Sequence, residues 1–224
     1  MKISSLLIDF YGTLVEDDDQ IVNDICNEIQ NASEIQVSSV EVRKEWCEQF
    51  YNLTDKHYGK YFRKQRELSY ISLNNTIQLY KSSCLTNDLI QRQYNYLSKP
   101  RIFLDSKSFF RDCKLPVYIV SNIDNDNINE AIKFHDIHVS GVLSSEDARS
   151  YKPRPELFKK ALKEFNLRPE EVVYIGDSLR SDVMGSHKAG LKCIWLNRKN
   201  SINLFVKPNY TINNLSILTE VLEG

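Results

Sequence analysis

Four groups of polar residues follow apolar runs of the chain and together supply the side chains that phosphate and metal chemistry requires. In chain order they are Asp9 after "LLI", Ser121 with Asn122 after "VYIV", Lys152 in "SYKPRPELF", and Asp177 with Asp182 in "GDSLRSD". Asp9 precedes Gly12, which lets the chain turn sharply, so its carboxylate is placed like a nucleophile that forms a covalent intermediate. Taken singly, each residue is also typical of a turn, a helix cap or a solvated lysine.

Taken together and in this order, the residues favour a shared site. Ser121 and Asn122 offer a hydroxyl and backbone amides to an anionic oxygen, and Lys152 offers an ammonium group to the same point. Asp177 and Asp182 beside Asp9 would repel one another unless a cation lies between them. Carboxylate oxygens are the ligands that Mg²⁺ prefers, so the sequence predicts a magnesium site.

The apolar runs that carry these residues alternate with helix-like segments. Buried strands are predicted at residues 3–10, 115–122, 139–145, 171–177 and 191–197, with a last short strand at 210–212 before a closing helix. Helices are predicted between them, one of which begins at Pro155. This alternation indicates an α/β fold with a doubly wound parallel sheet, in which ligands bind at the carboxyl ends of the strands.

The segment from about residue 16 to 101 does not follow this alternation. It contains several amphipathic helical patterns, such as "QIVNDICNEIQNAS" and "TNDLIQRQYNYLSK". We therefore predict a core domain formed by residues 1–15 and 102–224, and a helical cap domain formed by residues 16–101. The basic and aromatic stretch from Lys56 to Arg66 is interpreted as a solvated face of a cap helix, and as part of closure over an anionic substrate if it is functional.

Composition narrows the classes of partner. The formal net charge of −1 provides no general attraction to nucleic acid or to an anionic membrane, so we expect a small anionic substrate held by local groups. Five scattered cysteines without a CxxC pair argue against a disulfide framework or a zinc site. With no apolar run of membrane-spanning length, the chain is expected in the cytoplasm. The oligomeric state is not predicted.

These motifs resemble the four motifs of the haloacid dehalogenase superfamily, and the insertion after the first strand is similar to its helical type 1 cap. The resemblance implies an aspartyl-enzyme mechanism with Asp9 as the nucleophile and Lys152 and Ser121 as catalytic partners. It also implies that Thr13, Ser121, Asn122 and Lys152 surround the transferring group. The implied metal residues are Asp9, the backbone carbonyl of Tyr11, Asp177, and Asp182 as a more distant support.

Tyr11 departs from the phosphatase pattern, which usually has an aspartate there as the general acid and base. A phenol with a pKa near ~10 is a poor general base at neutral pH. D-x-Y-G-T-L is typical of 2-haloacid dehalogenases, in which Arg43 would resemble the halide-facing arginine. Asp177 and Asp182 depart from that branch, as does Phe158, which stands where those enzymes have a tyrosine.

We therefore expect a Mg²⁺-dependent phosphohydrolase that acts on a small phosphorylated metabolite through an aspartyl-phosphate intermediate. Without the usual acid, substrates with good leaving groups such as acyl phosphates are favoured. Two alternatives stay open: a 2-haloacid dehalogenase that forms an aspartyl ester, and a catalytically impaired protein of the same fold with a binding or regulatory role.

Overall fold

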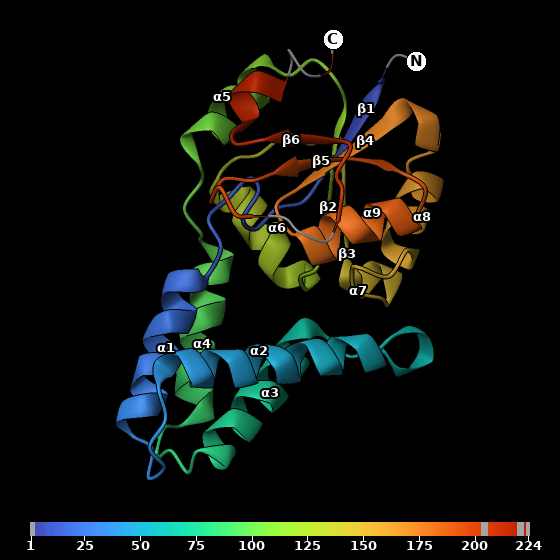
Figure 1. Cartoon of the computed structure of the whole chain (residues 1–224). Helices are drawn as coiled ribbons and strands as arrows, with labels where there is room; N and C mark the ends of the chain where they lie inside the picture. The colour runs from blue at the N-terminus through green and yellow to red at the C-terminus, as the bar shows by residue number, and fades with distance from the viewer. Residues whose placement is uncertain (1–2, 203–205, 219–221, 223–224) are drawn as a thin grey trace. The chain divides into compact units, whose positions relative to one another are not determined.

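The computed structural model describes residues 3–202, 206–218 and 222, and these residues form two compact units (Figure 1). The first unit combines the N-terminal segment up to Glu16 with Arg101–Asn122 and the chain from His135 onward. The second unit combines Asp17–Pro100 with Ile123–Phe134. The predicted core domain, residues 1–15 and 102–224, includes this last segment.

A parallel sheet of six strands forms the centre of the first unit. Its strands are β1 (Ser5–Ile8), β2 (Val117–Ser121), β3 (Gly141–Ser144), β4 (Val172–Gly176), β5 (Lys192–Leu196) and β6 (Tyr210–Ile212), in the spatial order β3-β2-β1-β4-β5-β6. The chain first extends the sheet to one side of β1 and then crosses to the other side. This reversal between β1 and β4 is the switch point at which doubly wound sheets bind ligands. The predicted fold class is confirmed.

Both faces of the sheet are covered, which explains the unbroken apolar character of its strands. Leu6 and Leu7, on opposite faces of β1, are both fully buried. Leu7 packs in a core cluster with Leu157 and Phe158 of α8. Leu6 faces the side on which Phe109 of α5 lies. The helical elements of this unit are α5 (Leu104–Asp112), α7 (Ser145–Ala148), α8 (Glu156–Glu164), η2 (Pro169–Glu171), η3 (Leu179–Met184), α9 (Gly185–Lys188) and η4 (Leu215–Ile217).

The second unit is helical. It consists of α1 (Asp19–Asn31), α2 (Ser39–Lys56), η1 (Gly59–Tyr61), α3 (Gln65–Leu79), α4 (Thr86–Ser98) and α6 (Asn125–Phe134). The apolar face of α1 is buried at positions spaced three and four apart, as in Val22, Ile25 and Ile29. Ser38 and Glu41 form a reciprocal capping box that fixes the start of α2.

A carboxylate distant in sequence caps helix α3. Asp124 is buried and accepts hydrogen bonds from the backbone N–H groups of Gln65 and Arg66, at 2.7 and 2.9 Å. Asn127 of α6 extends this link by donating to the carbonyl of Tyr94, at 3.3 Å. These bonds join the start of α6 and the residue before it to α3 and α4, which explains why this segment groups with the helical unit.

The segment from Lys56 to Arg66 differs from the predicted helix face. Helix α2 ends at Lys56, a single short turn η1 follows, and α3 begins at Gln65. The only glycine of this segment, Gly59, adopts a φ of +58°, which interrupts helical geometry there. Within the segment, Lys60 stacks its ammonium over the ring of Tyr61, which is exposed.

Two further observations concern membrane-spanning helices and the cysteines. Among the described residues, no helix combines the length and apolar character needed to cross a membrane. All five cysteines, Cys26, Cys47, Cys84, Cys113 and Cys193, are free thiols.

Replacement of Asp124 by alanine tests the cap on α3. We expect Asp124→Ala to lower the free energy of unfolding by about 1–3 kcal/mol, because two N–H groups would lose a charged acceptor in a buried position. Urea unfolding measures this change, and amide hydrogen exchange at Gln65 and Arg66 should accelerate. Asp126→Ala, at an exposed position two residues on, is the control. Equal unfolding midpoints for the two variants would contradict this role.

Candidate active site

The carboxyl ends of β1, β2 and β4 bring the predicted catalytic residues together within the first unit. Asp9 follows β1, and its backbone N–H donates to Ile175 of β4 at 2.9 Å, which continues the parallel pairing to the point where the strand ends. Ser121 is the last residue of β2 and is buried. Asp177 follows β4 directly.

Lys152 is the centre of the site. Its ammonium group is fully buried and donates to Oδ1 of Asp182 at 2.7 Å, to Oδ1 of Asp9 at 2.8 Å and to the hydroxyl of Tyr174 at 2.8 Å. The carbonyl oxygen of Val120 lies 3.2 Å from the same nitrogen. A buried cation with a full set of acceptors and two carboxylate partners avoids the large cost of an unpaired charge.

Burial and charge shift the pKa values of this group in defined directions. Burial raises the pKa of Asp9, and the ammonium of Lys152 offsets part of that effect. Burial alone would lower the pKa of Lys152, but the carboxylates of Asp182 and Asp9 reverse this and raise it. Lys152 therefore remains charged at neutral pH, and it is held directly against the predicted nucleophile.

Asn122 positions Lys152 through the backbone. Its side-chain amide donates to the carbonyl of Lys152 at 3.0 Å and accepts from the N–H of Lys152 at 2.8 Å. The side chain thus makes two hydrogen bonds, one as donor and one as acceptor, with the backbone of a single residue. The predicted contribution of Asn122 to the transferring group is its backbone amide, and its side chain instead bonds to the backbone of Lys152.

The three acidic residues predicted for metal binding form a cluster. One carboxylate oxygen from each of Asp9, Asp177 and Asp182 lies within 4.8 Å of the others. Asp177 accepts a hydrogen bond from the Thr13 hydroxyl at 3.3 Å. Asp182 is fully buried, and both its oxygens are used: Oδ1 by Lys152 and Tyr174, and Oδ2 by the N–H of Ser178 at 2.9 Å.

Two glycines create room for these carboxylates. A Cβ atom on Gly12 would lie 2.6 Å from Oδ2 of Asp177, and Gly12 adopts a φ of +77°. A Cβ atom on Gly176 would overlap the Asp182 carboxylate in the same way, at 2.5 Å from Oδ2. Both positions therefore require glycine, because the backbone lies in direct contact with an acidic side chain.

Tyr174 and Arg198 support the site without having been predicted. The Tyr174 hydroxyl donates to Asp182 at 2.8 Å, and burial raises its pKa well above the usual value, so the phenol stays protonated. Arg198 donates to the carbonyl of Thr13 and to Asp105, both at 2.8 Å. In the sequence, a tyrosine within a predicted strand cannot be told from an ordinary core residue. Arg198 lies 185 positions after Thr13, so no local pattern connects the two residues.

The remaining predicted residues lie elsewhere or have other contacts. Tyr11 pairs its backbone with Val15 in an isolated bridge, and its ring makes an edge contact with Phe10 at a centroid distance of 5.0 Å. Arg43 belongs to the helical unit, where its two terminal nitrogens donate to Asp19 and Asn23. Phe158 is fully buried and contacts the ring of Tyr174 edge-on at 4.9 Å.

The haloacid dehalogenase-like hydrolase family model matches residues 6–196, which include all of these motifs. This chain belongs to the haloacid dehalogenase-like hydrolases. The whole chain is similar to the pyrophosphatase PpaX of Bacillus mycoides, with 23% identity over 99% of this chain and 98% of that protein. A segment is 42% identical to the glyceraldehyde 3-phosphate phosphatase of Pyrococcus furiosus, but that match covers only 32% of each chain.

Solved structures of the same fold cover the full length of this hydrolase. A crystal structure of an L-2-haloacid dehalogenase matches with a TM-score of 0.80 and 17% identity over 100% of both chains. The hydrolase YfnB of Bacillus subtilis, determined with magnesium bound, matches with a TM-score of 0.78 and 19% identity over 100% of both chains. At these identities the structures establish the fold of this hydrolase, and its substrate has to be argued from its own site.

Removal of the Tyr174 hydroxyl tests its support of the site. We expect Tyr174→Phe to lower the free energy of unfolding by about 1.5–3 kcal/mol, because Lys152 and Asp182 would each lose a hydrogen bond in a buried position. Denaturant unfolding provides the measurement. Tyr118→Phe is the control, since that ring stacks on Phe165 in the same unit. A change no larger than in the control would show that the hydroxyl contributes nothing.

A glycine pair separates backbone strain from crowding of Asp177. Gly12 and Gly190 have nearly equal φ values, +77° and +80°, but only a Cβ on Gly12 meets another atom within 4 Å. Alanine at either position should cost about 1 kcal/mol of stability or somewhat more. Only Gly12→Ala should also reduce hydrolase activity, by roughly 100-fold, because it displaces a site carboxylate. Steady-state rates of both folded variants decide this, and equal rates would refute the crowding argument.

Proposed function

We propose that this hydrolase is a Mg²⁺-dependent phosphohydrolase that acts on a small phosphorylated metabolite through an aspartyl-phosphate on Asp9. The observation that supports this most directly is the buried Lys152 ammonium bonded to Asp9, with Asp177 in the same acidic cluster. This arrangement combines a nucleophile, a fixed positive charge for phosphoryl oxygens and an oxygen-rich cation site.

The donor set fits Mg²⁺. The cluster offers carboxylate oxygens and no nitrogen or sulfur ligands, which suits a hard divalent cation. We assign the metal to Asp9, Asp177 and the backbone carbonyl of Tyr11, and we assign Asp182 to the positioning of Lys152, since both its oxygens are already bonded. When bound, Mg²⁺ would neutralise charge between Asp9 and the substrate phosphate, so that two anions can approach.

The reaction then takes two displacements at phosphorus. An oxygen of Asp9 attacks the phosphorus atom, and the bond from phosphorus to the leaving oxygen breaks with its electron pair on that oxygen. Water next attacks the aspartyl-phosphate and loses a proton, which releases inorganic phosphate and restores the Asp9 carboxylate. Lys152, Thr13, Ser121 and the backbone amide of Asn122 surround the transferring group and stabilise its negative charge.

Tyr11 limits the range of leaving groups. With a phenol in place of a carboxylic acid, this position lacks an efficient proton donor for a leaving alkoxide. An acyl phosphate releases a carboxylate, which needs no proton at neutral pH. We therefore infer that acyl phosphates or other substrates with good leaving groups are hydrolysed faster than simple alkyl phosphates.

The dehalogenase alternative is supported by Tyr11 and by the haloacid dehalogenase structures among the neighbours. The contacts of Arg43 weigh against it, because Asp19 and Asn23 occupy the terminal nitrogens that a halide would need. Buried Phe158 adds no hydroxyl group of the kind expected in that branch. The free thiols support our inference of a reducing cytoplasmic setting.

A product assay with and without Mg²⁺ tests the proposal. Acetyl phosphate, an alkyl phosphate panel and 2-chloropropionate are the substrates, with phosphate and halide release as the readouts. We expect Mg²⁺-dependent phosphate release that is fastest from acetyl phosphate and falls at least about 10³-fold in Asp9→Asn. Asp136→Asn, at a highly exposed position, is the matched control and should retain activity.

Each of two other results would indicate a different function for this hydrolase. Halide release that does not need metal would establish the dehalogenase and overturn the phosphohydrolase. Mg²⁺-dependent ligand binding without any product would instead indicate the binding or regulatory role.

A further inference from the structure

The helical unit contains a cavity of about 210 Å³ that the reaction at Asp9 does not explain. Its walls come from the start of α1 and from α2, α3 and α4. Its charged and amide lining residues are Asp18, Asp19, Arg43, Gln65 and Gln93. At about 30 Å³ per water-sized group, the cavity has room for roughly seven such groups. A cavity of this size accommodates one end of a small metabolite.

The charges in the cavity leave a carboxylate without a cation. Arg43 donates to both Asp19 and Asn23, so its positive charge is already compensated by Asp19. Asp18 accepts a hydrogen bond from Nε2 of Gln93 at 2.6 Å. Burial raises the pKa of Asp18, and the charges of Asp17 and Asp19 add to this rise, whereas a cationic ligand would lower it. The lining therefore has an excess of negative charge when Asp18 is ionised.

Two amide oxygens add to this negative potential. Gln93 is only 8% exposed, and its Oε1 has no hydrogen-bond partner within the described structure. Oε1 of Gln65, a second lining residue, is also buried without a partner there. Unpaired acceptors in a cavity are stabilised by a nearby cation or hydrogen-bond donor.

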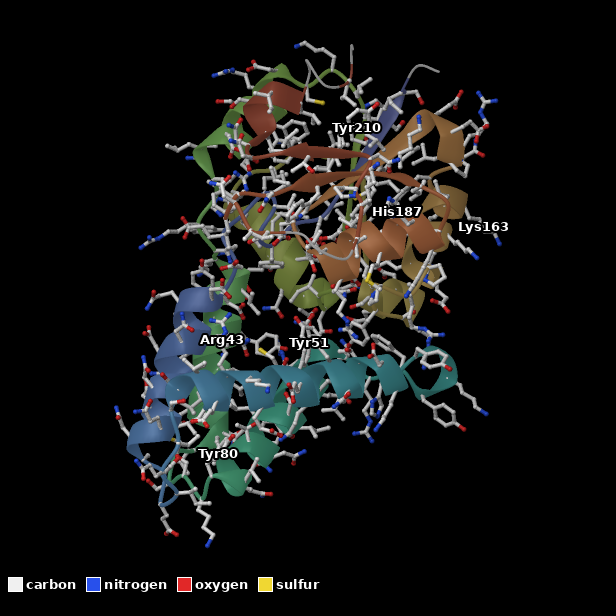
Figure 2. The ribbon with its side chains drawn as sticks, viewed as in Figure 1. Arg43, Tyr51, Tyr80, Lys163, His187 and Tyr210 are labelled. Carbon is white, nitrogen blue, oxygen red and sulfur yellow. The ribbon has the colours of Figure 1, made fainter. Side chains whose placement is uncertain are left out.

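Aromatic rings complete the wall. Trp46, Phe50 and Tyr51 line the cavity from α2. Trp46 and Phe50 stand three and seven residues after Arg43, so they share one face of that helix with it, and Tyr51 follows Phe50 directly. Figure 2 shows Arg43 and Tyr51 along the same side of α2. Aromatic faces attract ammonium groups through their quadrupole, and the attraction is strongest where water is excluded.

From this combination we infer that the cavity binds the ammonium group of a small organic amine, with Asp18 as its carboxylate partner and the α2 aromatic residues around it. A halide or a carboxylate is not a suitable occupant, since the lining repels anions.

The two tryptophan indoles of the chain report binding directly. Trp46 lines the cavity, whereas the indole N–H of Trp195 donates to the carbonyl of Asp177 in the other unit. In ¹⁵N-labelled protein titrated with 2-aminoethanol, we expect the Trp46 indole signal to shift and the Trp195 signal to remain in place. Ethylene glycol, a neutral molecule of similar size, should leave both signals unchanged. No shift at Trp46, or an equal shift with ethylene glycol, would overturn the inference.

Conservative variants test the two recognition elements, the Asp18 carboxylate and the aromatic face, without removing large parts of the core. Asp18→Asn keeps the size of the side chain and removes its charge, and it should weaken 2-aminoethanol binding at least roughly tenfold. Tyr51→Leu removes an aromatic face at a position that is 45% exposed, and it should weaken binding several-fold. Asp88→Asn, an exposed carboxylate outside the cavity lining, is the control and should bind as wild type. Unchanged affinity in both cavity variants would refute the assignment.

Discussion

The ion pair between Lys152 and the carboxylates of Asp9 and Asp182 is the interaction on which the rest of the site depends. A fully buried ammonium is stable only if its donors are satisfied and its charge is compensated, and this one is bonded to Asp9, Asp182 and Tyr174. Each partner comes from a different part of the chain. The ammonium therefore fixes Asp9, the proposed nucleophile, at the end of β1 relative to η3 and β4, before any substrate binds.

The backbone geometry allows these charged side chains to lie close together. The sheet reverses its strand order between β1 and β4, so that Asp9 and Asp177 leave neighbouring strands at the same edge. Gly12 and Gly176 then permit a carboxylate to lie directly against the main chain, where any Cβ atom would overlap it. Sheet topology brings the residues near one another, and the two glycines set the final distances. Both the sheet topology and the glycines are needed, because a shift of about 1 Å in a catalytic group lowers the reaction rate strongly.

Much of this could be predicted from the sequence, since strand ends and short motifs are local signals. Asp9 and Asp177 directly follow apolar runs, Lys152 and Asp182 belong to short polar motifs, and all four lie together in the structure. Tyr174 could not be assigned in advance, because its role depends on a lysine 22 residues away that folds against it. Asp124 is similar: its acceptors are N–H groups 58 and 59 residues earlier, and no local pattern connects them. Residues whose hydrogen-bond partners are distant in sequence cannot be recognised from a short stretch of the chain.

Tyr11 affects the charge balance of the site as well as its acid–base chemistry. Asp9, Asp177 and Asp182 exceed the single ammonium of Lys152 by two negative charges, which one divalent cation would neutralise. A fourth carboxylate at position 11 would leave an excess that opposes an anionic substrate, unless it were protonated. With tyrosine there, the proposed metal-loaded site is neutral and receives a phosphate without that repulsion. Tyrosine also provides no efficient proton donor, so in the proposed phosphohydrolase both easier approach of the anion and dependence on good leaving groups would follow from this single residue.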